Sequence, residues 1–438
     1  MAVLSSGNRV LYIRRQEDLS LDFTVRGTLF PNWATPGNAN QLTSRITFES
    51  TSPNKIYVNW GDGSTDSYDF VFVSANVYRI RFSRRLQNTP PIPYSEAYDA
   101  PLHYYQDLGS ATGTVDDNLD VRRIVSFSFD VPENVSSITS HLNRFYDTLP
   151  VGLGALRSLE GLDIAYCYNV DRVPASLFRT NIKNLRLSSI GEAYRLAIPE
   201  WVLQSPLVSL DIGGNDYNNH ESSNLNKINL LKNTLTELTL NGNNLEDLPA
   251  EFSDLNITSL SINSNRFTII PSVVNSITTL QHLNFLAGHS STSLVMEWGD
   301  ISNLTNLISL TYSSAFSSES NQFTVNLPAY FVNFTKLRTV RCSSVFFQTQ
   351  IRCDTHVEEW YSLINNNASK SVGNTAFRNI TFIYHNTTYP QYNLRPSGIY
   401  QQPAGYVQGV SNGTPVSPME MIWVMVNQYG HTWTVKPL

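Results

Sequence analysis

A leucine pattern that recurs through the middle of the chain constrains the fold more than any other feature. Residues 235–243, LTELTLNGN, show it clearly, with three apolar residues at fixed offsets followed by an asparagine. The pattern L-x-x-L-x-L-x-x-N/C returns at intervals of 22 to 30 residues. A unit of this length cannot bury its own apolar face and must stack on its neighbours, so the sequence predicts a solenoid. The central apolar positions are Leu162, Leu185, Leu210, Leu238, Leu260, Leu283, Leu310 and Val340.

A proline provides a second fixed point in most repeats, 11 or 12 residues before the next central position. The length of the repeat varies only between the strand and this proline, as stacking of aligned coils requires. Period and pattern together resemble those of leucine-rich repeats. The resemblance implies an α/β leucine-rich-repeat solenoid with parallel strands on its concave face and the prolines on its convex face. The prolines are Pro150, Pro174, Pro199, Pro249, Pro271 and Pro328.

The last position of the pattern predicts structural residues. Asn215, Asn243 and Asn265 occupy it, where a side-chain amide can bond the backbone of adjacent turns. Cys167 stands at the same position and is expected to be structural rather than nucleophilic. Four copies depart from the pattern at this position, so we expect an irregular ladder there: Ile190, Gly288, Ala315 and Val345.

The residue after each central position is expected to point outward from the strands. The resulting surface is small, polar and poor in aromatic anchors, which favours hydrated contact with a glycan or a polar protein. The alternative is that short polar residues only permit close strand stacking. The candidate binding residues are Asp163, Tyr166, Arg186, Asp211, Thr239, Asn241, Ser261, Asn263, Asn284, Thr311 and Arg341.

Residues 1–118 lack the repeat and read as alternating strands joined by turns. The string WGDGS, residues 60–64, resembles the signature of PKD-like immunoglobulin-fold modules. The resemblance implies an all-β, immunoglobulin-like domain ahead of the solenoid. Trp60 and Asp62 are then structural, because Asp62 and Asp66 are too few oxygen ligands for calcium.

The repeats are expected to extend into capping coils, which gives a solenoid over residues 119–390. Residues 122–130 are predicted to be a strand, and 136–150 a helical back segment. At the far end, 356–367 is predicted to be helical and 378–386 extended. The tail, 391–438, is predicted to hold a short helix that starts after Ser417 and ends near Gly430, then a terminal strand. The tail packs either on a partner or on the end of its own solenoid.

Composition argues against several classes of protein. A net charge of -6, without a basic stripe, argues against nucleic acid. Three cysteines are too few for a disulfide framework, and no paired spacing indicates a metal, so no metal and no cofactor are predicted. No apolar run is long enough to span a membrane. No catalytic motif is present, and the chain is predicted not to be an enzyme. A polysaccharide-depolymerising enzyme stays an alternative, since paired carboxylates can come from distant coils.

The combination of modules resembles surface proteins of Bacteroidales and virion proteins of the crAss-like phages that infect them. Because the N-terminus lacks a signal peptide, we expect a non-enzymatic phage attachment protein, a fibre, spike or tail-associated adhesin. It would be assembled in the host cytoplasm, localise to the virion and bind other virion proteins and a host-surface glycan or protein. The alternative is a bacterial cell-surface adhesin. A homo-oligomer or larger assembly is expected, anchored through residues 10–25 in preference to 399–438.

Overall fold

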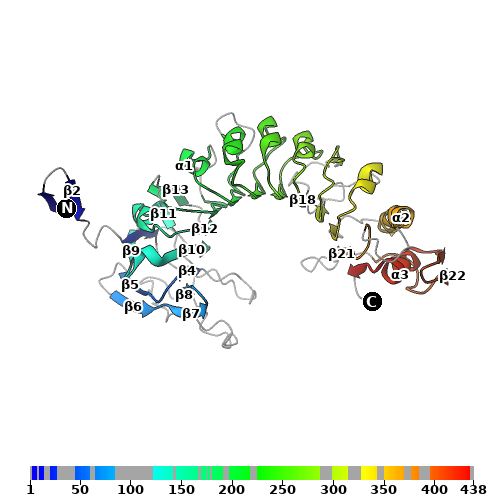
Figure 1. The fold of residues 1–438 in the computed structure, drawn as a ribbon, viewed down its shortest axis with the longest axis horizontal. Helices are drawn as coiled ribbons and strands as arrows, with labels where there is room; N and C mark the ends of the chain where they lie inside the picture. The colour runs from blue at the N-terminus through cyan, green and yellow to red at the C-terminus, as the bar shows by residue number, and fades with distance from the viewer. Residues whose placement is uncertain are drawn as a thin grey trace, which may run out of the picture. The chain divides into compact units, whose positions relative to one another are not determined.

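The computed structural model describes residues 2–6, 9–13, 20–26, 45–59, 65–83, 122–141, 145–165, 169–174, 176–177, 180–190, 197–217, 224–286, 298–313, 327–342, 350–368, 376–383 and 395–434. The chain divides into two compact units, residues 1–215 and 216–438. Figure 1 labels the helices and strands along the chain. Each unit is built around strands whose apolar side chains face inward.

The first unit begins with a short hairpin and a β-sandwich. The hairpin pairs β1 with β2, and the sandwich stacks a sheet in the order β13-β11-β3-β9-β5-β6 against strands β10-β4-β8-β7. Phe48 on β4 packs on Phe127 and Phe129 of β9, with ring centroids 5.1 and 5.5 Å apart. All three rings are buried, so the core of the sandwich lies between the two sheets. The strands are β1 (Ala2–Ser6), β2 (Arg9–Ile13), β3 (Leu21–Arg26), β4 (Arg45–Ser50), β5 (Lys55–Asn59), β6 (Thr65–Asp69), β7 (Val71–Ser74), β8 (Val77–Ser83), β9 (Arg122–Phe129), β10 (Val135–His141), β11 (Phe145–Thr148) and β13 (Asn169–Arg172).

Two segments expected in the first solenoid coil belong to this sandwich instead. Residues 122–129 do form a strand, but β9 pairs antiparallel with β3 and β5. Residues 136–150, expected to be helical, contain β10 and β11. Apolar residues spaced by three, as at Val135 and Ile138, fit a helix face as well as an irregular strand, and the bulge in β10 produces this spacing.

Strand β10 joins the sandwich to the solenoid. It pairs antiparallel with β4 on one side and parallel with β12 (Gly161–Ala165) on the other. Strands β14 (Asn184–Arg186) and β15 (Ser209–Asp211) continue the parallel ladder. The predicted centres Leu162, Leu185 and Leu210 lie in register on these strands and are at most 2% exposed.

The second unit continues the same design. Its centres lie in register from Leu238 to Leu260, Leu283, Leu310 and Val340, and each is at most 1% exposed. The prediction of a parallel-strand solenoid is therefore confirmed. The ladder consists of β16 (Glu237–Thr239), β17 (Ser259–Ser261), β18 (His282–Leu286), β19 (Ser309–Ser313), β20 (Thr339–Cys342), β21 (Thr381–Ile383) and β24 (Thr432–Thr434).

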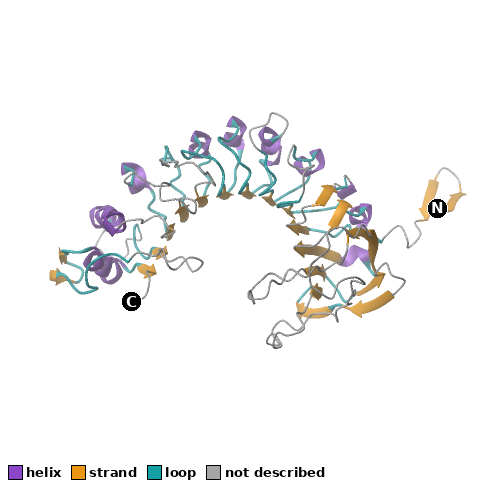
Figure 2. Ribbon diagram, turned by 180° about the vertical axis from the view of Figure 1, so that it is seen from behind, coloured by secondary structure: helices purple, strands orange, loops and turns teal. Residues whose placement is uncertain are grey.

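The prolines open the short helices that lie opposite the strands (Figure 2). Each is the residue before a helical turn, and its carbonyl accepts a hydrogen bond of 3.0 to 3.1 Å from the backbone N–H three residues later. Proline suits this place because it fixes φ and has no N–H to satisfy. The residue that donates is buried in every case: Leu153, Leu177, Val202, Phe252, Val274 and Phe331. Most of these turns lie in η4 (Val151–Ala155), α1 (Glu200–Leu203), η9 (Ala250–Asp254), η10 (Ser272–Ser276) and η11 (Ala329–Asn333); η8 (Leu225–Leu231) follows Asn224 instead.

The C-terminal segment forms the last coil of the solenoid. Helix α3 (Pro418–Tyr429) begins at Ser417, whose hydroxyl accepts from the Glu420 N–H, and ends at Gly430 in the left-handed conformation. Strand β24 then pairs parallel with β21, and α3 packs on α2 (Gln350–Asn367). The tail thus folds on the end of its own chain, the second of the two arrangements expected for it.

His431 gives this coil a specific pH dependence. Its Nδ1 accepts from the Ile380 N–H at 2.9 Å, and burial lowers the pKa of the imidazole to about 3. Below the ordinary pKa of 6.5 the imidazole is protonated in the unfolded chain but stays neutral in the folded chain. The free energy of unfolding therefore decreases as the pH is lowered. We expect a loss of up to about 1.4 kcal/mol per pH unit between about pH 6 and pH 4.

Urea unfolding at several pH values measures this loss. Carboxylates add their own pH dependence, so the difference in slope between the natural chain and His431→Gln isolates the imidazole. Equal slopes would show that His431 is not held neutral.

Candidate functional site

The outward side chains of the parallel strands form one polar surface in each unit, here termed the strand face. In the first unit Asp163, Arg186 and Asp211 are neighbours in register. In the second unit a corresponding row runs through five strands and is half-buried except at its exposed last member. That row is Thr239, Ser261, Asn284, Thr311 and Arg341.

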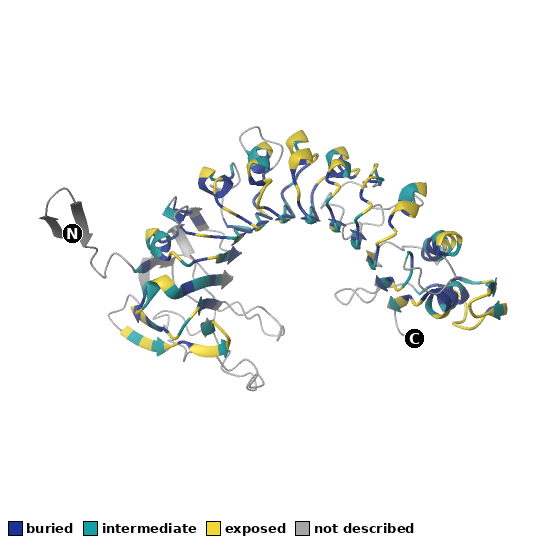
Figure 3. Cartoon of the chain, in the orientation of Figure 1, coloured by how far each residue is buried: buried dark blue, intermediate teal, exposed yellow. Residues whose placement is uncertain are grey.

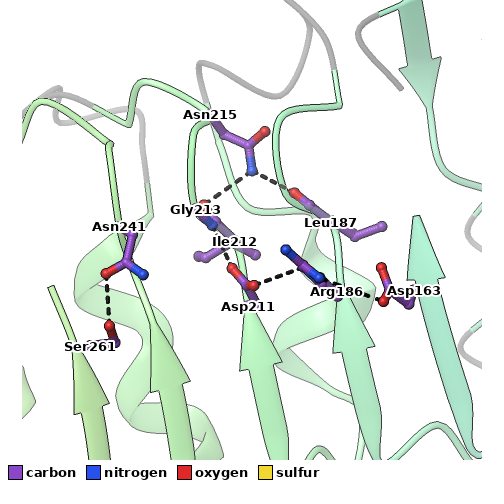
Figure 4. Close-up of polar contacts among 9 residues, drawn as sticks. All are labelled: Asp163, Arg186, Leu187, Asp211, Ile212, Gly213, Asn215, Asn241 and Ser261. Carbon is purple, nitrogen blue, oxygen red and sulfur yellow. Dashed lines mark hydrogen bonds and ion pairs between the residues drawn. The ribbon is translucent and has the colours of Figure 1, made fainter. Parts of the chain in front are cut away.

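The three charged side chains of the first unit's strand face pair with one another (Figure 4). The Arg186 guanidinium lies between the two carboxylates, with Nε 3.0 Å from Asp211 Oδ2 and Nη1 3.7 Å from Asp163 Oδ2. Asp211 Oδ1 also accepts from the Gly213 N–H at 2.9 Å. Burial raises the pKa of Asp211 above its ordinary value, although Gly213 and Arg186 act against it. With an arginine between them, the two carboxylates do not form the open pair that a glycosidase requires.

The asparagines of the repeat bond the backbone along the edge of the stack. Asn265 is 1% exposed; its Nδ2 donates to the Leu240 and Ile262 carbonyls, and its Oδ1 accepts from the Asn243 and Leu245 N–H groups. These bonds satisfy backbone groups that turn inward between coils.

The other two asparagines act in the same way. Asn215 donates to the carbonyls of Leu187 and Ile212 (Figure 4). It also accepts from the N–H of Ile190. Asn243 donates to the Leu240 carbonyl. Ile190, where an irregular ladder was expected, is therefore bonded by the asparagine of the next coil. The stacked parallel strands and the asparagines that bond their turns give a fold like that of leucine-rich repeats.

Amide and hydroxyl groups of the second unit bond one another across the strand face. Asn241 Oδ1 accepts from the Ser261 hydroxyl at 2.9 Å (Figure 4). It also accepts from the Asn263 N–H at 2.7 Å. Asn263 Nδ2 lies 3.2 Å from the same Ser261 hydroxyl. These side chains are thus pre-positioned by their neighbours, which lowers the entropic cost of binding a ligand.

The strands carry a second row of outward side chains that the sequence pattern did not predict. It lies one residue before each central position, where the alternation of a strand also points the side chain away from the core. The row is mostly hydroxyl-bearing and adds hydrogen-bonding groups beside the first one. Its members are Glu237, Ser259, His282, Ser309 and Thr339.

Some candidate residues lie outside the described residues. These are Tyr166 and Cys167 at the end of β12, and Trp60 and Asp62 between β5 and β6. The strands that flank residues 60–64 do pair as a hairpin, with Asn59 opposite Thr65. The PKD-like character of the sandwich stays a prediction.

Two further observations concern what the described parts of the chain hold. No group of three His, Cys, Asp or Glu side chains among them could bind a metal ion. Within the same residues, no helix combines the length and apolar character needed to cross a membrane.

Comparison with known proteins gives a fold likeness only. No family model matches the chain, and no curated protein sequence does. Among solved structures it is similar to a leucine-rich-repeat protein of Leptospira interrogans, at 17% identity and a TM-score of 0.28 over 46% of this chain and 64% of that one. It is also similar to the Arabidopsis receptor kinase HAESA in complex with the peptide hormone IDA and the co-receptor SERK1. The identity there is 18% and the TM-score 0.29, over 49% of this chain and 36% of that one. The PEPR1–AtPEP1 complex has 19% identity and a TM-score of 0.30, over 49% of this chain and 32% of that one. The chain spans less than two thirds of each of these proteins.

Proposed function

We propose that the chain is a non-enzymatic recognition protein whose strand face binds a polar partner, a protein or a glycan on a host cell surface. The observation that carries this proposal is the double row of outward polar side chains on β16 to β20, most of which bear a hydroxyl group. Adjacent strands lie about 4.8 Å apart, so the rows offer regularly spaced hydrogen-bonding groups to an extended ligand. Asn241 and Ser261, which are half-buried and fixed by mutual hydrogen bonds, suit many modest contacts rather than one deep pocket. Asn263 is only 8% exposed, so it positions these groups and offers little contact of its own.

The setting we propose is a phage virion that infects Bacteroidales, with attachment as its role. It is supported by the resemblance of the module combination and by the polar character of the strand face. A bacterial surface adhesin would use the same face. Mass spectrometry of purified virions distinguishes the two, because only a virion protein is recovered with the particle.

A pair of substitutions on β19 tests the strand face. Ser309→Arg with Thr311→Arg places two large cations among the small polar side chains of both rows. We expect the fluorescently labelled full chain to bind encapsulated Bacteroidales cells, and the double variant to lose at least about tenfold in affinity, or about 1.4 kcal/mol. Flow cytometry over a concentration series gives the two dissociation constants.

The matched control carries the same chemical change on the helix side. Ser276→Arg with Thr278→Arg alters two exposed residues at the end of η10, and we expect unchanged binding. Equal loss in both double variants would contradict recognition through the strand face. Shortening of capsular polysaccharide by the natural chain would contradict the non-enzymatic assignment.

A further inference from the structure

A continuous uncharged segment covers the C-terminal end of the second unit. Residues 396–419 contain no Asp, Glu, Lys, Arg or His, whereas 15% of the whole chain is Asp, Glu, Lys or Arg. The segment includes the hairpin of β22 (Ala404–Val407) and β23 (Ser411–Thr414). Charged residues are depleted at the centres of protein interfaces, so their absence here points to a contact surface.

Buried amides hold this segment firmly on α2 and α3. Gln428 Oε1 accepts from the Tyr406 hydroxyl at 3.2 Å and from the Gly409 N–H at 3.0 Å. Asn412 Nδ2 donates to Asn365 Oδ1 and to the Tyr429 hydroxyl. These contacts fix the hairpin in one position, so it needs no ordering when it meets a partner.

Glu420 and Trp423 complete the inner side of the hairpin. The Gln401 amide and the Val416 N–H donate to the Glu420 carboxylate, which is 5% exposed. The Tyr406 ring packs edge-on against Trp423, with centroids 4.7 Å apart. The inner side of the hairpin is therefore held on α2 and α3 by hydrogen bonds and ring packing.

Many residues of the same segment are exposed (Figure 3), and several of them are large and apolar. Val407 follows Tyr406 on β22 and is 52% exposed, because successive strand residues point to opposite sides. Residues 399–416 hold five of the exposed large apolar side chains in the described parts of the chain, and a concentration of exposed apolar surface marks an interaction site. The group, here termed the hairpin surface, consists of Ile399, Tyr400, Val407, Val410 and Val416, each at least 45% exposed.

We propose that the hairpin surface joins two copies of this chain. In a twofold symmetric contact the same surface meets itself, so any charge at its centre would face a like charge. A surface without charges avoids this repulsion and suits self-association better than contact with a charged partner. Specific interfaces bury about 1,000 Å² or more in total, an area within reach of five exposed apolar residues and the neutral backbone between them from each copy.

The consequence for recognition is multivalency. A dimer presents the strand face of each of its two chains. Linking two binding sites in this way raises the apparent affinity of weak contacts without adding any new contact. The proposal itself concerns assembly and does not depend on the ligand of the strand face. Self-association and cell binding can therefore fail separately.

Sedimentation velocity of the full chain over a concentration series tests the proposal. We expect the natural chain to form a dimer below about 100 µM. Ile399→Asp with Val407→Asp introduces four carboxylates into the dimer contact and is expected to weaken dimerisation at least about tenfold. Both residues are exposed, so circular dichroism and the unfolding temperature should not change.

Leu230→Asp is the control, because Leu230 on η8 is 60% exposed in the same unit. We expect it to dimerise like the natural chain. A natural chain that stays monomeric throughout the series would overturn the proposal. Dimerisation of the double variant with unchanged affinity would also overturn it, since the contact would then lie on another surface.

Discussion

Leu260→Ala is expected to lower the free energy of unfolding by about 2 to 5 kcal/mol, since it removes buried methyl groups and leaves a cavity. Leu260 is 0% exposed and lies in register between Leu238 and Leu283. Each coil of a solenoid is stabilised mainly by the coils on either side, so a cavity at one centre weakens two interfaces.

Urea unfolding measures the global loss, and hydrogen exchange locates it. We expect backbone amides of β16 to β18 to lose protection before those of α2. Leu230→Ala makes the same chemical change at a 60% exposed side chain and should cost less than about 0.5 kcal/mol. Equal costs at the two leucines would contradict the inward orientation of the centres.

Asn265→Ala is expected to cost about 3 kcal/mol or more, a large effect for the loss of one polar side chain. The substitution leaves the N–H groups of Asn243 and Leu245 buried without the acceptor that Asn265 provides. It also removes the donor to the carbonyls of Leu240 and Ile262. Buried donors without acceptors cost about 1 to 3 kcal/mol each, more than the hydrogen bonds contribute on average.

Asn256→Ala is the matched control, because Asn256 is exposed and makes a single 3.3 Å bond to the Lys232 carbonyl. Its cost should stay within about 0.5 kcal/mol. Asn265→Asp keeps the shape of the side chain and its acceptor oxygen but removes the N–H donor. Comparing it with Asn265→Ala distinguishes the loss of hydrogen bonds from the loss of side-chain volume. A loss close to zero for Asn265→Ala would show that the asparagine ladder does not stabilise the stack.

The two stability predictions also separate folding from function. Leu260 and Asn265 face inward, so their substitution should reduce cell binding only as far as it unfolds the chain. Ser309→Arg with Thr311→Arg should reduce binding in a folded chain. Measuring unfolding and binding on the same samples distinguishes these cases.

The sequence alone determined the repeating part of this protein. The apolar periodicity placed Leu238 and Leu260 inward, the prolines marked the side of the solenoid opposite the strands, and strand alternation placed Thr239 and Ser261 on the strand face. The sequence also predicted α3, because the residues that cap its two ends, Ser417 and Gly430, are adjacent to the helix in the sequence. These features depend on contacts within one repeat or between neighbouring repeats, where local spacing fixes which way a side chain points.

Only the tertiary structure decided which strands pair over long distances. Ile138 lies beside Phe48 on one side and Leu162 on the other, so β10 belongs to both the sandwich and the solenoid. The raised pKa of Asp211 and the neutral state of His431 depend on how far each side chain is buried, and sequence spacing does not specify burial. The sequence offered residues 399–438 as the second choice of anchor, but the structure was needed to show which of them form the hairpin surface. An apolar residue is core or contact surface according to what the rest of the chain leaves uncovered.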